Sequence, residues 1–396
     1  MILPQKNILA AGVLAALLLA TALGLWLRDT QAGSIDLAQY WSAARLFVSG
    51  RNPYDPQLLG EIQRSEFPGR ETILMWNPPH ILALTFPLGF MSFTWAKAIW
   101  SILTFGSFAY AIISALKLVR QQSGVKFDRA TGACLLLFAL SFYPLYSCAW
   151  YGQASFMPLV GVTLFLANTS RQGAIRTWPA ALGLFLTTIK PHEFYLLYLF
   201  LVFEWLRRRE AALIVRTAAI LGVSLAAIAV YSPQVFSWYI AAWSAPPLYF
   251  RTPTLGAWLQ DFTQIHSLAI RALPSMIFAG AYILLRLKFS AIKDELQHLL
   301  VLIPFSLVSA PYGWIFDHVV LLPTAFWIVL HANSQRRWWP AVLLVALNIS
   351  IMPMPGKVVP FQIYELYYPL GFGILALMCT YWRKQALPAS KPQQPL

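Results

Sequence analysis

This chain has very little charge for its 396 residues. Lys, Arg, Asp and Glu make up only 11% of it, whereas soluble domains average about 25%. Hydrophobic residues reach 58%, which is more apolar surface than one water-soluble core can bury. The composition therefore excludes a soluble globular protein and indicates a protein embedded in a membrane.

Cysteine is also scarce, and its spacing forms no motif. Cys134, Cys148 and Cys379 lie in apolar or interfacial stretches with no paired spacing. Neither a disulfide framework nor a thiolate metal site is predicted, and we expect no cofactor. Segments of about ten residues that alternate apolar and polar side chains, typical of membrane barrels, are missing too. The chain is therefore predicted to cross the membrane with helices.

The sequence is rich in apolar runs of about 20 residues, the length that a helix needs to cross about 30 Å of hydrocarbon. They predict an all-α integral membrane protein with about 12 transmembrane helices in one polytopic domain, residues 1–382. Residues 383–396 follow as a cytoplasmic tail that is predicted to be disordered. The first run resembles a secretory signal but is long for one, so we expect it to be retained. The expected spans are 8–27, 94–116, 130–148, 155–168, 178–189, 192–206, 211–231, 265–286, 297–310, 319–332, 339–354 and 363–382.

Basic residues are distributed unevenly between the predicted loops. Most of the 29 Lys and Arg residues fall on one side of the membrane, while the other side has a balanced charge. Basic loops stay in the cytoplasm, so both termini are predicted to be cytoplasmic in a multi-pass protein of the cell (inner or plasma) membrane. The net charge of +14 then reflects topology and does not indicate nucleic acid. The cytoplasmic segments are Lys6, 117–129, 171–176, 207–216, 286–293, 336–337 and the tail.

The first outer loop, residues 28–74, is the longest polar segment. Apolar residues recur at helical spacing from Leu37 to Ser49, which predicts an amphipathic helix on the membrane surface that ends at Gly50. Asp36 precedes this helix, and as a lone carboxylate it is explained best as a structural helix cap. The apolar stretch Pro78 to Phe90 is too short to span and is interpreted as re-entrant or interfacial.

Several short motifs follow one another along the chain. They are Asp36 with Tyr40, Ala43-Ala44 and Gly50; Asn52-Pro53-Tyr54-Asp55; Trp76-Asn77-Pro78-Pro79 with Pro87; Gly152-Gln153; Lys190-Pro191; and Asp317-His318. In this order they resemble the motifs of glycosyltransferase family 87, over nearly the whole chain. The sequence departs from the family pattern at Ala154-Ser155, where an Asn often stands, and at Asp36, which lacks the adjacent second acid of some related enzymes.

The resemblance implies a type C glycosyltransferase. Such enzymes use a polyprenyl-phosphate sugar, commonly mannose, as donor at the outer face of the membrane. The implied partners are this donor, a glycolipid or glycan acceptor and membrane lipids. The active site is expected to face the periplasm or the exterior.

The chemistry of such a transfer can be matched to residues of this chain. A carboxylate must take the proton of the attacking hydroxyl, and Asp36 is the candidate general base. With inversion at the anomeric carbon one base is enough, by analogy with inverting glycosidases. A phosphate leaves without protonation, so no second acid is required, and the lone acid argues against a metal site.

Negative charge that grows on the phosphate must be stabilised by cations. Lys190 interrupts a long apolar run, which favours a function, although snorkelling or a structural pair with Glu193 would also explain it. His318, Arg251 and His192 are further candidates, with loop or interfacial roles as alternatives. We expect the outer ends of the spans that carry these residues and Gln153 to converge around one cavity, with Asp36 at its rim.

Three residues are candidates for substrate contact: Gln153, Tyr40 and Tyr54. Gln153 could instead satisfy turn backbone, and Tyr54 could shape the Asn-Pro-Tyr-Asp turn. Two other classes of protein compete with the glycosyltransferase. A secondary transporter would place its ionisable residues near the bilayer midplane between repeats, which we do not find. A non-catalytic lipid-binding subunit would leave Asp36 dispensable.

Overall fold

The computed structural model describes most of the chain after residue 32. The described residues are 33–123, 129–169, 177–209, 211–289, 292, 294–334, 337, 339–352 and 362–386. The first predicted span, 8–27, lies outside them.

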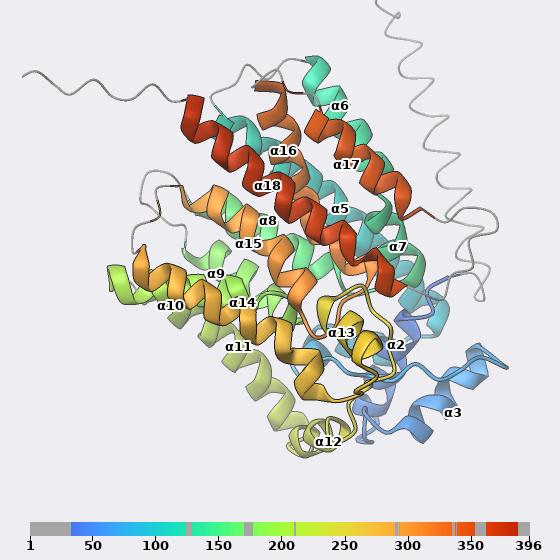
Figure 1. The fold of residues 1–396 in the computed structure, drawn as a ribbon. Coiled ribbons are helices and arrows are strands. Elements are labelled where there is room, and N and C mark those ends of the chain that lie inside the picture. The colour runs from blue at the N-terminus through green and yellow to red at the C-terminus, as the bar shows by residue number, and fades with distance from the viewer. Residues whose placement is uncertain are drawn as a thin grey trace, which may run out of the picture. The chain divides into compact units, whose positions relative to one another are not determined.

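All regular structure in these residues is helical, as the apolar runs predict (Figure 1). The elements are α2 Leu37–Val48, α3 Pro56–Glu66, α4 Ile81–Thr85, η1 Phe86–Phe90, α5 Phe93–Ser123, α6 Arg129–Ser141, α7 Tyr143–Tyr151, α8 Phe156–Asn168, α9 Thr177–Thr187, η2 Pro191–Glu193, α10 Tyr195–Arg208, α11 Ala212–Tyr231, α12 Val235–Ala242, α13 Leu255–Thr263, α14 Leu268–Lys288, α15 Glu295–Ser309, η3 Ile315–Leu321, α16 Leu322–Ser334, α17 Trp339–Ser350, η4 Gln362–Leu366 and α18 Tyr367–Ala386.

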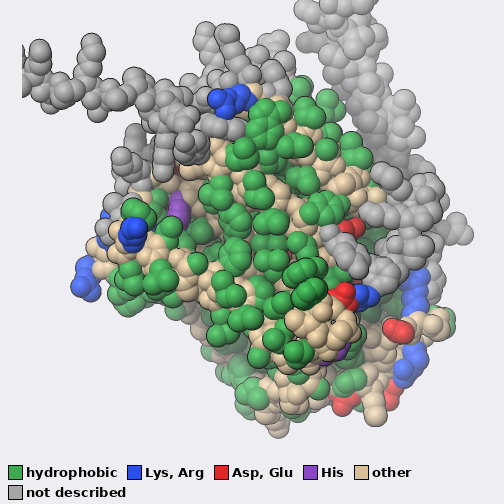
Figure 2. All heavy atoms as spheres, in the orientation of Figure 1, with side chains coloured by type: hydrophobic (Ala, Val, Ile, Leu, Met, Phe, Trp, Pro, Cys, Tyr) green, Lys and Arg blue, Asp and Glu red, His purple; other side chains and the backbone are tan. Residues whose placement is uncertain are grey.

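Five helical segments are long and apolar enough to cross a membrane: Phe93–Gln121, Thr131–Tyr151, Ala212–Tyr231, Leu268–Lys288 and Ile315–Ala332. Several carry large hydrophobic side chains that face outward; Val230 in α11 is 87% exposed and Leu284 in α14 is 69% exposed. Hydrophobic side chains cover much of the face in Figure 2. These features indicate a membrane protein, whereas the expected number of 12 spans stays a prediction.

The described chain divides into two compact units. One comprises Met1–Phe105, Ala149–Gln153 and Leu225–Ser244, and is called unit 1; the other comprises Gly106–Cys148, Ala154–Ser224 and Ala245–Leu396, and is called unit 2. Helices α5, α7 and α11 each continue from one unit into the other along the chain. One polytopic domain over residues 1–382 stays a prediction.

Unit 1 is built around α2. The helix spans almost the predicted residues, but it has no exposed polar face, because ten of its twelve residues are buried. Its polar Ser42 is bonded by Gln63 of α3, whose amide donates to the Ser42 hydroxyl over 3.0 Å. On another side η1 approaches so closely that a Cβ on Gly89 would lie 2.6 Å from the Ala44 carbonyl oxygen. The helix is therefore buried within unit 1, and its place on the membrane surface stays a prediction.

Unit 2 contains the shorter helices α8 and α9, which pack closely against each other. A Cβ added to Gly161 would lie 2.6 Å from the Gly183 carbonyl oxygen, and the reverse holds as well. Small residues at such a crossing let two backbones approach, as is common between membrane helices. At the C-terminus α18 continues to Ala386, so the first residues of the predicted disordered tail are helical. Residues 387–396 lie outside the described part.

Candidate functional site

Asp36 stands at the start of α2, but its side chain does not cap the helix. No first-turn N–H of α2 bonds to the Asp36 carboxylate in the described structure. The Asp36 backbone N–H donates instead to the Tyr151 carbonyl over 2.9 Å, which ties the helix start to the end of α7. The cap interpretation of this carboxylate is therefore wrong.

The Asp36 carboxylate is bonded to the Gly-Gln turn instead. The Gln153 amide donates to Asp36 Oδ2 over 2.8 Å, and the Gln153 amide oxygen accepts from the Tyr40 hydroxyl over 3.0 Å. Because a carboxylate can only accept, Asp36 takes the nitrogen end of this amide, and the oxygen end accepts from the Tyr40 hydroxyl. Three predicted site residues thus form one chain of hydrogen bonds within unit 1.

Packing fixes this chain of hydrogen bonds from behind. The Tyr40 ring stacks on Trp100 with centroids 5.4 Å apart, and Trp100 Nε1 donates to the Gly152 carbonyl over 2.8 Å. Gly152 has φ +68°, and a Cβ there would lie 2.9 Å from Leu37 Cβ. A left-handed conformation and close contact both require glycine at this position. Tyr40 and Gln153 are buried, whereas Asp36 is partly exposed, so the carboxylate is the accessible end.

Tyr54 is buried, and its hydrogen bonds are to other residues of unit 1. Its side chain is 4% exposed, and its hydroxyl donates to the Asn77 carbonyl over 3.1 Å. Its backbone N–H donates to Asn52 Oδ1, which closes the Asn-Pro-Tyr-Asp turn. Burial raises the pKa of Tyr54 well above its ordinary value, so the phenol stays neutral. Asp55 caps α3 by accepting from the N–H groups of Gln57 and Leu58.

In unit 2, Lys190 forms a buried ion pair. Its side chain follows α9 and is paired with Asp317 of η3, which is fully buried. Lys190 also donates to Ser155 Oγ over 3.0 Å, and Ser155 in turn donates to Asp317. The second Asp317 oxygen accepts from the Trp314 N–H over 2.8 Å. The sequence suggested Glu193 as a structural ion-pair partner of Lys190, but the ion pair is with Asp317.

The two predicted histidines belong to the surroundings of this ion pair. His318 is 1% exposed and stacks on Tyr368 at 5.4 Å, and its Nδ1 has no hydrogen-bond partner in the described part of the chain. His192 lies in η2, with Nε2 at 3.9 Å from Glu193 Oε1. Burial leaves His318 no open face for a ligand in this conformation.

Arg251 is paired with Asp261 and lines a cavity of about 570 Å³ formed by residues 246–266 of unit 2. Lys190, His192 and His318 do not line this cavity. It is therefore not the shared cavity that we predict for these residues, and their convergence stays a prediction.

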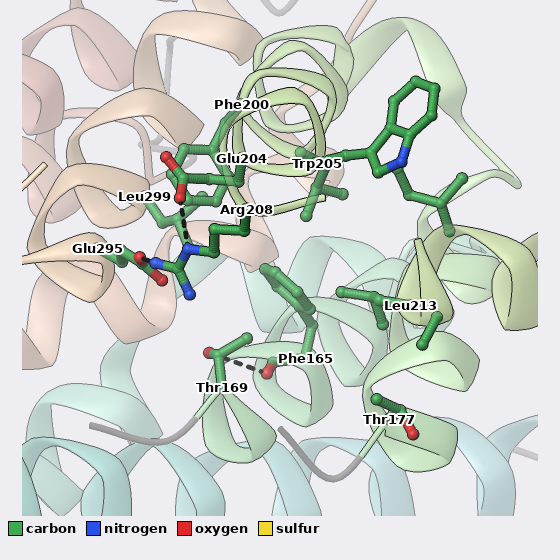
Figure 3. Close-up of a pocket in the computed structure, with 13 residues that line it drawn as sticks. Phe165, Thr169, Thr177, Phe200, Glu204, Trp205, Arg208, Leu213, Glu295 and Leu299 are labelled. Carbon is green, nitrogen blue, oxygen red and sulfur yellow. Dashed lines mark hydrogen bonds and ion pairs between the residues drawn. The ribbon is translucent and has the colours of Figure 1, made fainter. Parts of the chain in front are cut away.

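A second pocket in unit 2, of about 260 Å³, is lined by none of the predicted site residues. In Figure 3 the Arg208 side chain lies between Glu204 and Glu295. Arg207 and Arg286 also pair with Glu204, the latter over 2.8 Å. These ion pairs join α10, α14 and α15 next to predicted cytoplasmic loops. We therefore interpret the charged residues of this pocket as a structural ion-pair network.

The contacts of several residues of these sites were not identified from the sequence. Ser155 and Trp100 were assigned no role, and Asp317 was named only in its motif with His318, because their partners lie 35 to 162 residues away. Arg271 was not singled out either, although it is a fully buried cation. An arginine inside an apolar run was the one signal that could have revealed it.

Comparison with known proteins gives one match. A family model described as glycosyltransferase family 87 matches residues 76–355, and this range includes Gln153, Lys190, Arg251 and His318. Asp36 and Tyr40 precede the matched range. No curated protein and no solved structure matches the chain.

Proposed function

Because the chain belongs to glycosyltransferase family 87, we propose that it transfers a hexose from a polyprenyl-phosphate sugar to an acceptor at the outer face of the membrane. Membership of this family makes it a glycosyltransferase, and its apolar helices make it a membrane protein. Mannose is the sugar that we favour, since it is the common donor sugar of related enzymes. Asp36 is the proposed general base.

The observation that supports this proposal most directly is the Asp36–Gln153–Tyr40 chain of hydrogen bonds. A base must be held in position, accessible, and within reach of the proton it removes. The buried Gln153 and Tyr40 hold the partly exposed Asp36 carboxylate at the rigid start of α2. A lone helix cap needs no such support from a residue 117 positions away.

The proposed reaction is a single displacement. The acceptor oxygen attacks the anomeric carbon, its proton passes to the Asp36 carboxylate, and the bond from the anomeric carbon to the phosphate oxygen breaks. The phosphate takes the electron pair and leaves as an anion, so the sugar is inverted and no acid is needed.

Lys190 is the residue that we propose for the donor phosphate. Its charge is balanced by Asp317 in this structure, so a bound phosphate would share the ammonium group with that carboxylate. His318 and His192 are proposed to support this site, and Arg251 is discussed separately below. A buried ion pair is costly unless it serves position or function, which is compatible with this assignment.

Asp36→Asn, with Asp55→Asn as a matched control, tests the proposed function. Both acids are N-terminal to helices of the same loop, but only Asp55 caps its helix. Purified protein would be supplied with a panel of labelled polyprenyl-phosphate hexoses and membrane extract as acceptor. We expect Asp36→Asn to lose about 10² to 10⁴ in rate while donor binding persists, and Asp55→Asn to stay close to wild type.

Transfer by a folded Asp36→Asn protein within about threefold of wild type would contradict the assignment, because that is under about 1 kcal/mol of barrier. Absence of transfer from every donor in the panel, with a folded wild-type protein, would favour the rival of a non-catalytic lipid-binding subunit.

A further inference from the structure

The cavity that Arg251 lines has the size and composition of a binding site. Its volume of about 570 Å³ lies within the range of roughly 300–1,000 Å³ that small-molecule pockets occupy. It is formed by the segment before α13, by α13 and by the turn that follows. Its lining residues are Pro246, Leu248, Tyr249, Phe250, Arg251, Ala257, Gln260, Asp261, Gln264 and His266.

The polar groups of this cavity offer both donors and acceptors. Arg251 is paired with one oxygen of Asp261, and their side chains are 39% and 31% exposed. The other Asp261 carboxylate oxygen and the His266 ring make no hydrogen bond within the described residues. Gln264, in a left-handed conformation at φ +58°, follows α13 and adds an amide, one donor of which bonds to the Asp261 backbone carbonyl. Planar groups of this kind can bind neighbouring hydroxyls in pairs.

An aromatic surface adjoins these polar groups. The Tyr249 side chain is 70% exposed, and its ring contacts Phe250 with centroids 4.5 Å apart. Phe250 in turn contacts Trp314 at 5.5 Å. A large exposed ring beside hydrogen-bonding groups suits a ligand with one apolar face and polar edges, as a pyranose ring has.

Arg271 of α14 holds the wall of the cavity in place. Its five N–H donors are all used, and its guanidinium lies 4.1 Å from the Tyr312 ring centroid. No carboxylate pairs with it in the described part of the chain. The acceptors are the carbonyls of Leu248, Phe250 and Pro311, Gln260 Oε1 and Thr252 Oγ1, at 2.6 to 3.1 Å.

Burying the Arg271 cation is unfavourable, but its hydrogen bonds fix the segment before α13 and α13 itself, which both line the cavity. Because this wall is already ordered, ligand binding does not carry the entropy cost of ordering it, which favours affinity. Gly256 contributes as well, because a Cβ there would lie 2.0 Å from the Arg271 carbonyl oxygen, so α13 and α14 cross without room for a side chain.

We propose that this cavity binds a pyranose unit of a glycan acceptor. The ion pair of Arg251 with Asp261 leaves the lining side chains without net charge, which disfavours a free phosphate as the ligand. That this glycan is the acceptor of the transfer rests on the proposed function. The inference assigns Arg251 to the glycan and not to the donor phosphate.

Binding can be measured without catalysis, so that this inference and the proposed function are tested separately. Free manno-, gluco- and galacto-oligosaccharides would be added to the full-length Asp36→Asn protein in lipid nanodiscs, with saturation-transfer NMR and calorimetry as readouts. Tyr249→Ala and Asp261→Asn are the test variants. Phe262→Ala is the matched control, since Phe262 is a 73% exposed aromatic of α13 that does not line the cavity.

We expect at least one oligosaccharide series to bind and both test variants to weaken it about tenfold or more, because each removes a contact to the ligand. Phe262→Ala should bind as the unaltered protein does. In the active protein the test variants should raise KM for the acceptor and leave KM for the donor unchanged.

The inference is overturned if no oligosaccharide binds, if Tyr249→Ala and Phe262→Ala behave alike, or if inorganic phosphate displaces the bound sugar. None of these results depends on whether Asp36 is the base. Conversely, an active Asp36→Asn protein would contradict the proposed function and leave the binding measurement valid.

Discussion

The Gln153 amide donates a 2.8 Å hydrogen bond to the Asp36 carboxylate, although 117 residues separate them in the sequence. This bond joins two of the motifs on which the family resemblance rests. It also gives the Gln153 side chain a partner that the turn alone would not require. Within unit 1, the proposed base is therefore held by a residue from a distant segment.

Gln153→Ala should slow transfer without removing the base. Loss of the amide lets the Asp36 carboxylate leave its position, and misplacement of a reacting group by about 1 Å can cost about 10²-fold in rate. We expect kcat to fall at least about tenfold. Tyr40→Phe should give a smaller loss, because it removes only the hydroxyl that orients the amide. Unchanged kcat in both variants would show that Asp36 does not depend on this chain of bonds.

Gly152→Ala should destabilise the protein more than Gly50→Ala. Both glycines have φ near +70°, but a Cβ on Gly152 would lie 2.9 Å from Leu37 Cβ, whereas nothing lies within 4 Å of one on Gly50. Conformational strain of about 1 kcal/mol applies to both, and overpacking adds about 1–3 kcal/mol at Gly152. Thermal unfolding in detergent measures the difference. Equal melting temperatures would mean that the turn relaxes away from α2.

Lys190→Met should be strongly destabilising on its own. It leaves Asp317 buried without its cation, which typically costs 3–5 kcal/mol, about the loss we expect here. The double variant Lys190→Met with Asp317→Leu should recover most of this stability, because no buried charge is left. If Lys190 also binds the donor phosphate, the stable double variant will still show a donor KM raised about tenfold or more. Wild-type kinetics in that variant would reduce Lys190 to a structural role.

Residues 50 and 209 should lie on opposite sides of the membrane. Single cysteines in place of Gly50 and Arg209 would be introduced into a chain without Cys134, Cys148 and Cys379. A membrane-impermeant maleimide should label the first in intact cells and the second only after permeabilisation. Labelling of both under the same condition would overturn the predicted topology.

The sequence alone was sufficient for features that depend on local composition and spacing. The apolar runs predicted helices and a membrane protein, and the spacing from Leu37 together with Gly50 located α2 almost to the residue. Asp36 was identified as a candidate base because a glycosyl transfer to a hydroxyl requires one carboxylate. The motif order also indicated the family that the later match confirmed.

Partners between distant segments were decided only by the tertiary structure. Lys190 was considered with its neighbour Glu193, but packing buries it against Asp317, 127 residues away. The polar face of α2 looked like a water-facing one, because the sequence cannot show that Gln63 covers Ser42. Periodicity fixes which residues share a face of a helix, whereas the choice of what that face contacts depends on long-range packing and burial, which local pattern does not encode.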